Sequence, residues 1–137
     1  MNIASIMIPK VSTVFLHEGD TVQQGLERFT VHGYTAIPVL NRQEQYVGCI
    51  TEGDFLRHIL AIRSTDPKRL EDTKIGAILR RDFCPALPID ASRDQVVSAI
   101  LNQNFVPIVD GRGQLSGILT RRKVIEYLAS EQASLLG

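Results

Sequence analysis

The clearest hydrophobic pattern in the chain runs from residue 33 to residue 56 and reads GYTAIPVLNRQEQYVGCITEGDFL. Two apolar runs, 34–40 and 46–50, flank the polar segment 41–45, which is typical of two strands joined by a turn. Beyond the second run, apolar residues recur at helical spacing: Phe55, Ile59 and Ile62. The segment therefore predicts strand, turn, strand and helix in that order.

The same pattern occurs a second time, in the segment NQNFVPIVDGRGQLSGILTRRKVI. Superposing the two segments without a gap gives a constant offset of 69 positions, and it aligns four marker pairs: Pro38 with Pro107, Asn41 with Asp110, Gly48 with Gly117, and Thr51 with Thr120. Self-similarity at a fixed spacing indicates an internal duplication. We therefore expect two structural repeats.

A further strand and helix are predicted ahead of each copy. The β-branched run 11–16 predicts the first strand, and the proline-broken run 83–89 takes its place in the second copy. Asp20 or Thr21 can cap the following helix, whose apolar positions are Val22, Leu26 and Phe29. Ser92 with Gln95 forms a capping-box signature for the corresponding helix of the second copy.

Three details complete the predicted layout. Gly33 is expected to end the first helix in the C′ position. Because Pro38 has no backbone donor, its strand is expected at a sheet edge or beside a ligand opening. A last helix from Arg121 is expected to pack Val124, Ile125 and Leu128, and the tail 130–137 is expected to fray.

Each copy thus reads as strand, helix, strand, strand, helix, so the fold class is α/β (α+β). We place the first repeat at 1–62 and the second at 75–137. The charged, proline-containing run 63–74 suits an exposed linker. Two such βαββα repeats packed about a pseudo-twofold axis would bury both apolar faces and create clefts at their junction.

Charge and hydropathy exclude several partners. The 137 residues carry 15 basic and 15 acidic side chains, so no global field attracts nucleic acid or an anionic membrane. Apolar runs fall far short of the roughly 20 residues that span a bilayer, and the N-terminus lacks a leader's apolar stretch. We expect a soluble cytoplasmic protein that binds neither nucleic acid nor membrane.

Metal, redox and catalytic chemistry find little support. Cys49 and Cys84 form no C-x-x-C pair, and Cys49 lies in an apolar run that favours a buried thiol. The three histidines stand 15 and 26 residues apart, without metal-ligand spacing. No nucleophile with a neighbouring base is readable, so we expect neither an enzyme nor a catalytic cofactor.

Two helix starts carry candidate chemistry. Thr51 and Asp54 form T-x-x-D, which fits a capping box, a ligand contact, or both. Thr120 is followed by Arg121, Arg122 and Lys123, three cations in the first turn of a helix. That placement is unfavourable unless an anion offsets it, so it favours a phosphate site. The alternative is that these side chains extend into water, pairing with acidic neighbours such as Glu126.

The doubled pattern resembles the paired cystathionine-β-synthase (CBS) domains, or Bateman modules. The residues that carry the resemblance are AIPVLN with VGCIT in the first copy and FVPIVD with SGILT in the second. It covers residues 6–129. More narrowly, GYTAIPVL together with GILTRRKV is similar to the small stand-alone CBS proteins of Gram-positive bacteria that bind cyclic di-AMP.

The resemblance implies that adenine nucleotides bind in the clefts between the repeats. It places the base against the residues that lead into Pro38, namely Tyr34, Thr35, Ala36 and Ile37, and it places ribose hydroxyls on Asp54. Lys123 stands where the second copy would have the matching aspartate, which is a departure from the family pattern. The cyclic di-AMP group also has a lysine near this point, so the resemblance makes Lys10 a candidate for a second phosphate contact.

Some of these residues have an ordinary explanation as well. Lys10 alone is most often a surface lysine. Ser12 and Thr13 are able to hydrogen-bond a base or ribose, yet hydroxyls at a strand end need no ligand to explain them. Tyr34 suits stacking on adenine and equally suits burial between repeats.

These observations lead to one functional prediction with two alternatives. We predict a homodimeric regulatory protein that senses cyclic di-AMP and modulates a partner protein. The resemblance implies a dimer formed through helices, and the apolar helix stripes, Phe55 with Ile59 and Val124 with Leu128, are compatible with it. The alternatives are a sensor of AMP, ATP or S-adenosylmethionine, and a dimerisation scaffold without a ligand.

Overall fold

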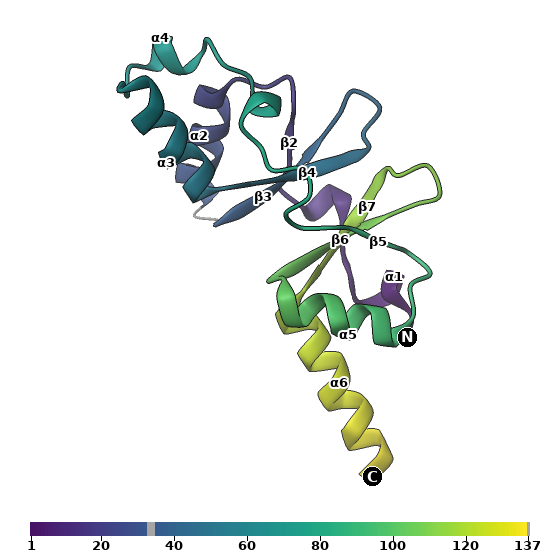
Figure 1. Ribbon diagram of the computed structural model, residues 1–137. Coiled ribbons are helices and arrows are strands. Elements are labelled where there is room, and N and C mark those ends of the chain that lie inside the picture. The colour runs from purple at the N-terminus through teal and green to yellow at the C-terminus, as the bar shows by residue number, and fades with distance from the viewer. Residues whose placement is uncertain (33–34, 137) are drawn as a thin grey trace. The chain divides into compact units, whose positions relative to one another are not determined.

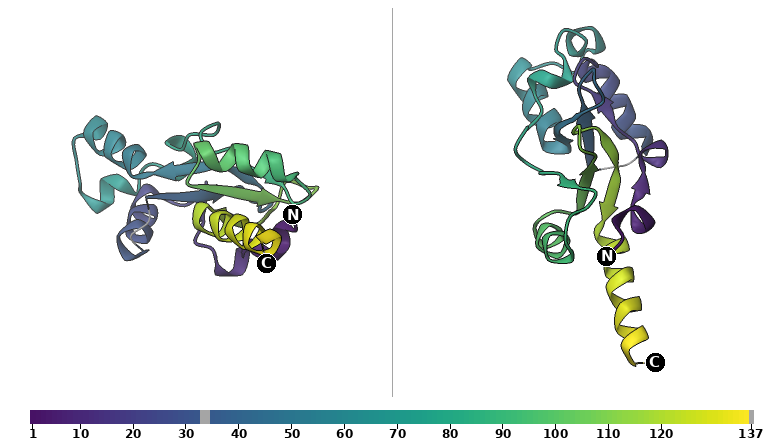
Figure 2. Two further views of the ribbon diagram at one scale, coloured as in Figure 1. Left: turned by 90° about the horizontal axis from the view of Figure 1, so that it is seen from below. Right: turned by 90° about the vertical axis from the view of Figure 1, so that its right-hand side faces the viewer.

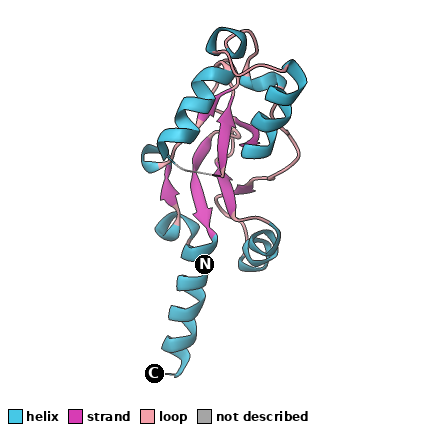
Figure 3. Cartoon of the chain, turned by 90° about the vertical axis from the view of Figure 1, so that its left-hand side faces the viewer, coloured by secondary structure: helices cyan, strands magenta, loops and turns pink. Residues whose placement is uncertain are grey.

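The hydrophobic pattern resolves into two sheets with helices packed against them, as the computed structural model shows for residues 1–32 and 35–136 (Figure 1). The chain divides into two compact units. The first-repeat unit comprises Val14–Phe83, and the second-repeat unit comprises Met1–Thr13 together with Cys84–Gly137. This mixed α/β architecture confirms the predicted fold class, and Figure 3 separates its strands from its helices by colour.

The first-repeat unit has a three-stranded sheet in the order β2-β3-β4. Its elements are β2 (Leu16–His17), α2 (Val22–His32), β3 (Ala36–Leu40), β4 (Tyr46–Thr51), α3 (Glu52–Ile62), α4 (Pro67–Leu70) and the 3-10 turn η2 (Ile75–Ala77). Strand β3 pairs parallel with β2 and antiparallel with β4. The buried core contains Leu16, Val22, Phe29, Ile37, Val39, Ile50, Phe55, Leu70 and Ile75.

The second-repeat unit has a four-stranded sheet in the order β1-β7-β6-β5. Its elements are α1 (Ile3–Ile6), β1 (Ile8–Pro9), the 3-10 turn η1 (Lys10–Ser12), β5 (Leu87–Pro88), α5 (Arg93–Asn102), β6 (Phe105–Val109), β7 (Leu115–Thr120) and α6 (Arg121–Leu136). The buried core contains Ile3, Ala91, Val96, Ile100, Val106, Ile108, Leu119 and Val124. Helix α6 continues beyond the sheet of its own unit (Figure 2).

The hairpin turns show the duplication at atomic detail. The Asn41 Oδ1 atom accepts backbone N–H bonds from Gln43 and Gln45, both at 2.9 Å. Asp110 does the same for the two equivalent residues of the second copy, at 2.8 and 3.0 Å. An Asx side chain at this position fixes the turn through its own backbone bonds, so both polar segments form the predicted turns.

The aligned glycines Gly48 and Gly117 lie where another segment crosses the sheet. A Cβ atom on Gly117 would clash with the Ile8 carbonyl oxygen of β1. A Cβ atom on Gly48 would clash with the Leu79 side chain and would lie 2.9 Å from the Arg80 carbonyl oxygen. Glycine is therefore required at both positions for steric reasons, because the crossing backbone occupies the space of a side chain.

These crossings exchange the opening segments of the two repeats. Met1–Thr13 belongs by packing to the second-repeat unit, where β1 pairs with β7, and Arg80 bridges to Cys49 of the first-repeat unit. The compact units therefore differ from the sequence repeats 1–62 and 75–137, whose boundaries remain a prediction about the duplication. Segment 63–74 was expected to be an exposed linker, but it contains α4, whose Leu70 is buried.

The strand predicted across 11–16 was wrong for most of its length. The backbone turns instead, with the Thr13 N–H bonded to the Lys10 carbonyl at 3.0 Å and the Thr13 hydroxyl bonded to the Pro9 carbonyl at 3.0 Å. Val11 is almost fully exposed, and strand structure begins only at Leu16. A β-branched run without a burying partner does not make a strand, because β propensity depends on packing context.

Pro38 does not lie on an edge strand, because β3 is the middle strand of its sheet. Pro38 pairs with Cys49 of β4, whereas pairing with β2 starts only at Val39. The missing proline donor is therefore tolerated where the β2 side of the strand carries no ladder bond.

The helix caps and ends differ in how well the pattern predicted them. The Ser92–Gln95 capping box is confirmed, and Thr21 rather than Asp20 caps α2 through reciprocal bonds with Gln24. Gly33, the expected helix end, lies outside the described residues. Helix α6 runs to Leu136, and the fraying expected from residue 130 stays a prediction. None of the helices in the described residues combines the length and apolar content that a bilayer crossing needs.

Candidate functional site

The junction between β4 and α3 forms the capping box that the T-x-x-D spacing predicts. The Asp54 N–H donates to Thr51 Oγ1 at 3.4 Å, and the Thr51 N–H donates to Asp54 Oδ2 at 2.8 Å. The Thr51 hydroxyl also lies 3.0 Å from the same carboxylate oxygen. Asp54 is only 3% exposed, so this carboxylate is a buried charge that needs partners.

Two arginines supply those partners at the second carboxylate oxygen. Arg57, one turn later on α3, donates to Asp54 Oδ1, and the Arg80 Nε atom lies 3.1 Å from the same oxygen. Arg80 also donates from Nη2 to Thr51 Oγ1 at 3.2 Å, and its guanidinium stacks 3.8 Å above the centroid of the Phe83 ring. We call these five residues, Thr51, Asp54, Arg57, Arg80 and Phe83, the arginine cluster.

The arginine cluster carries more positive than negative charge. Its two guanidinium groups face one carboxylate, and their side chains are 62% and 43% exposed for Arg57 and Arg80, against 2% for Asp54. The negative charge is therefore internal, whereas the positive charge reaches solvent. Attraction between a buried carboxylate and guanidinium groups is screened less than between exposed groups, which holds both arginines in place.

Sequence reasoning missed both arginines. Arg57 had a readable signal, because it follows Asp54 by three residues on a predicted helix, where side chains are neighbours. Arg80 had none, because it lies 26 positions beyond Asp54 in sequence and reaches it only through the crossing segment beside Gly48.

The residues expected to meet the base are largely brought together with this junction. Ala36 pairs with Thr51, and the Thr35 carbonyl accepts the Glu52 N–H at 3.2 Å. Thr35 is exposed, Ala36 is half-buried, and Ile37 and Pro38 are buried. Ile37 is part of the hydrophobic core, so its side chain is committed to packing. Tyr34 lies outside the described residues.

The three cations at the start of α6 have three different settings. Arg121 donates from Nε to the Ile100 carbonyl at 3.1 Å and from Nη2 to the Gln103 carbonyl at 3.2 Å. These carbonyls belong to the last turn and C-cap of α5, where a cation is favourable. Arg121 therefore links α6 to the C-terminal end of α5.

The settings of Arg122 and Lys123 agree with the alternative interpretation of the sequence, in which these side chains extend into water. Arg122 pairs with Glu126 at 3.1 Å with its side chain 89% exposed, as expected for a solvated face. The Lys123 N–H donates to Thr120 Oγ1 at 3.1 Å, so Thr120 caps α6, and the Lys123 side chain is exposed. Both cationic side chains thus remain accessible to solvent.

Lys10, Ser12 and Thr13 lie in and directly after η1 of the second-repeat unit. Ser12 is exposed, and Lys10 and Thr13 are half-buried. Because Pro9 pairs with Gly117 in an antiparallel register, the chain runs from there toward the beginning of β7. Pro9 therefore faces Gly117, three residues before Thr120 at the end of β7.

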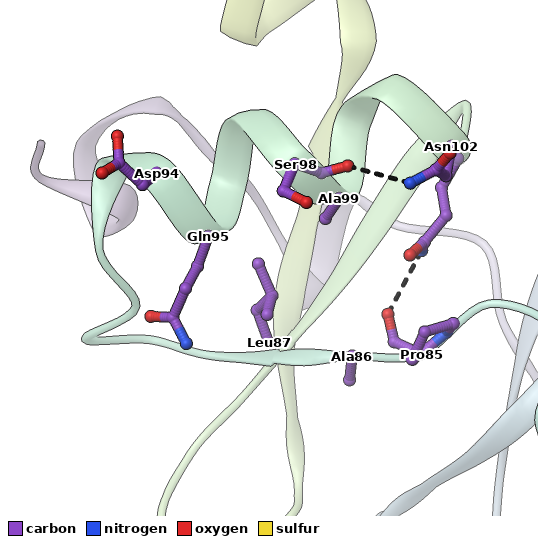
Figure 4. Close-up of a pocket in the computed structure, with 9 residues that line it drawn as sticks. Pro85, Ala86, Leu87, Asp94, Gln95, Ser98, Ala99 and Asn102 are labelled. Carbon is purple, nitrogen blue, oxygen red and sulfur yellow. Dashed lines mark hydrogen bonds between the residues drawn. The ribbon is translucent and has the colours of Figure 1, made fainter.

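A separate hollow of about 510 Å³ lies in the second-repeat unit between α5 and the segment ahead of β5 (Figure 4). It is lined by Pro85, Ala86, Leu87, Asp94, Gln95, Ser98, Ala99, Asn102 and Gln103. Several of its polar groups are already used, since Asn102 donates to the Ser98 carbonyl and Gln103 donates to the Pro85 carbonyl, both at 3.2 Å. None of the ligand-binding residues predicted from the sequence lines this hollow.

Metal chemistry gains no support from the described residues. Within residues 1–32 and 35–136, His, Cys, Asp and Glu side chains do not gather in groups of three or more that could hold a metal ion. Cys49 and Cys84 are both buried free thiols.

Comparison with known proteins places this geometry in context. The CBS domain family matches residues 3–61 and 74–130. Cyclic di-AMP receptor B of Bacillus subtilis is 25% identical over 133 residues, which cover 97% of this chain and 90% of the receptor. The solved structure of Listeria monocytogenes CbpB in complex with c-di-AMP is 27% identical, covers 97% of this chain and 98% of that chain, and has a TM-score of 0.83. A conserved hypothetical protein of Geobacillus kaustophilus is 28% identical, covers 96% and 98%, and has a TM-score of 0.82.

Proposed function

We propose, because the chain belongs to the CBS domain family, that it is a regulatory adenine-nucleotide sensor whose ligand is cyclic di-AMP. The observation that carries the proposal is full-length similarity to a protein named as a cyclic di-AMP receptor and to a CbpB structure solved with c-di-AMP. A nucleotide-binding regulatory role follows from that similarity, whereas the ligand and the regulated protein are our proposals.

The proposed ligand residues are those that the sequence nominated, with roles refined by their settings. Arg122 and Lys123 are the phosphate contacts at the start of α6, because both are exposed at a helix N-terminus where anions are favoured. Arg121 is a positioning residue, because its guanidinium is bonded to α5 carbonyls. Thr120 caps the same turn.

The adenosine end of the ligand is assigned to the remaining nominated residues. They are Ser12, Thr13, Tyr34, Thr35, Ala36, Ile37, Pro38, Thr51 and Asp54, and Lys10 is assigned a second phosphate contact instead. Among them, Ile37 contributes through its backbone, because its side chain is in the core. We place the protein in the cytoplasm, where it would bind no nucleic acid and no membrane.

The homodimer is also a proposal, but its surface differs from the one first expected. Phe55 and Val124 are buried in the cores of their own units, so they are not available to a second copy. On the same two helices, α3 and α6, the large apolar side chains that are exposed among the residues whose burial is described are Leu56, Leu60 and Ile125. Leu56 and Ile125 are equivalent positions of the two repeats at the offset of 69.

Calorimetric titration of the wild-type protein with cyclic di-AMP, AMP, ATP and S-adenosylmethionine tests the function. We expect the tightest binding for cyclic di-AMP. Binding of another member of the panel alone would favour an alternative sensor. If none of the four ligands gave a heat of binding and none shifted the melting temperature, we would conclude that the protein is a ligand-free scaffold.

Arg122→Ala tests the phosphate assignment. We expect a dissociation constant for cyclic di-AMP raised about tenfold, because a charge-assisted contact to phosphate is lost. Adenosine, which has no phosphate, should bind the variant and the wild type alike. An equal loss for adenosine would show that the substitution acts through folding.

A further inference from the structure

We propose that Arg80 binds a phosphate-class anion and that Asp54 serves to position it. The inference rests on the proposed nucleotide-sensing function and adds a ligand contact in the first-repeat unit. The Asp54 carboxylate, by the family resemblance a ribose contact, would then act through the arginine it holds.

Asp54 has little capacity left for a ligand. Its Oδ2 atom accepts from the Thr51 backbone and lies 3.0 Å from the Thr51 hydroxyl, while its Oδ1 atom is shared by Arg57 and Arg80. The side chain is 2% exposed. A ribose hydroxyl would reach this carboxylate only by displacing an arginine, which would leave a buried charge with fewer partners.

Arg80 has the opposite properties, because it is both fixed and accessible. Its Nε edge faces Asp54, Nη2 bonds to Thr51, and Phe83 supports the face of the guanidinium plane. Its own carbonyl is tied to the Cys49 N–H at 3.4 Å, so the backbone is also held. A guanidinium fixed on one edge has lost its side-chain entropy before binding, which favours affinity for the next partner.

The free edge of Arg80 matches the geometry of phosphate. Among the described residues, Nη1 has no hydrogen-bond or ion-pair partner, and the side chain is 43% exposed. A guanidinium presents paired N–H donors that suit two oxygens of one phosphate group. Arg57 adds a second exposed cation bonded to the same carboxylate oxygen, so the accessible side of the cluster is positive.

Arg80→Ala, compared with wild type on AMP and adenosine, is the direct test. We expect the dissociation constant for AMP to rise about tenfold and that for adenosine to change less than about twofold, because only AMP carries a phosphate. Arg69→Ala is the charge-matched control, since Arg69 is an exposed arginine on α4 of the same unit. It should leave both constants unchanged.

Several outcomes would overturn the assignment. Equal weakening of AMP and adenosine by Arg80→Ala, or equal weakening of AMP by Arg69→Ala, would show a folding effect or a general charge effect. Unchanged AMP binding in Arg80→Ala would remove Arg80 from the site while leaving the sensor function intact. If wild type bound neither ligand nor cyclic di-AMP, the proposed function would fail first, and the two failures are thereby distinguishable.

A double-mutant cycle separates the two roles of Asp54. Asp54→Asn should weaken AMP in the wild-type background and have little further effect in the Arg80→Ala background, because Asp54 acts through Arg80. Comparable loss for adenosine in both backgrounds would instead identify Asp54 as a direct ribose contact.

Circular dichroism melts of all variants verify that each titration is made on folded protein. If Arg80→Ala melts below the assay temperature, Arg80→Gln, which retains a donor for Thr51, takes its place with the same expectations.

Discussion

Individual side chains in this protein divide into those that hold the fold and those that remain available to a ligand. Arg121 and Arg122 are adjacent and carry the same charge, yet one is bonded to two backbone carbonyls and the other to an exposed glutamate. The sequence predicted a cationic turn correctly as a group. It did not separate the two roles, because the carbonyls of α5 approach Arg121 only in the folded unit.

The two arginines should therefore respond differently in a stability measurement. Arg121→Ala should lower the free energy of unfolding by about 1 kcal/mol, because two bonds from a cation to helix-terminal carbonyls are lost. Arg122→Ala should change it by less than about 0.5 kcal/mol, since its ion pair is exposed. Urea denaturation of both variants without ligand checks this expectation. Equal destabilisation would argue against the structural role of Arg121.

At the scale of the elements, the duplicated glycines explain why the sheets accept a crossing segment. Gly48 and Gly117 were readable as markers of the repeat, but their function was not. The pattern shows that glycine recurs at an offset of 69, whereas the atoms that exclude a side chain come from residues 8 and 79–80.

Gly48→Ala should destabilise the protein by about 2 kcal/mol, within the range for inserting atoms into a packed site. The added methyl group would meet the Arg80 carbonyl and the Leu79 side chain. Gly19→Ala is a matched control, because nothing lies within 4 Å of the position of its added Cβ. Thermal melts compare the two. A control as unstable as Gly48→Ala would show that loss of glycine, not the clash, is responsible.

The predictability of the elements followed the length and burial of each segment. The two central hairpins, α3 and both capping boxes were expected from alternation and spacing, because those signals are local. The short strand at 11–16 and the exposed linker were wrong, since Val11 finds no burying partner and Leu70 does. The contacts of Arg80 could not be predicted from the sequence, because they form only where its segment crosses the sheet beside Gly48 in the folded unit.

For the molecule as a whole, packing assigns the first thirteen residues to the second-repeat unit. Ile3 is buried with Val96, Ile100 and Val124, which follow it by more than ninety residues in sequence. The second-repeat unit is therefore discontinuous in sequence, whereas the first-repeat unit, Val14–Phe83, is one continuous segment. No local pattern indicates this, because the residues that pack against Ile3 lie far from it in sequence.

Ile3→Ala provides the test at this scale. We expect a loss of about 2–4 kcal/mol, typical of emptying a buried aliphatic site. Amide hydrogen exchange should accelerate in α5, β6 and β7 more than in β3 and β4, because the cavity opens in the second-repeat core. Val11→Ala, at an exposed position, is the control. Faster exchange confined to the first-repeat unit would contradict the assignment of Met1–Thr13.

The crossing segments also limit which fragments of this protein would contain a complete sheet and core. A fragment made of residues 75–137 would lack β1 and leave one side of β7 as a bare strand edge, a ready template for another chain. A fragment made of residues 1–62 would lack Ile75 and Leu70, two members of its unit's core. Neither fragment contains all of its unit's sheet and core, because the compact units divide the chain after Thr13 and after Phe83.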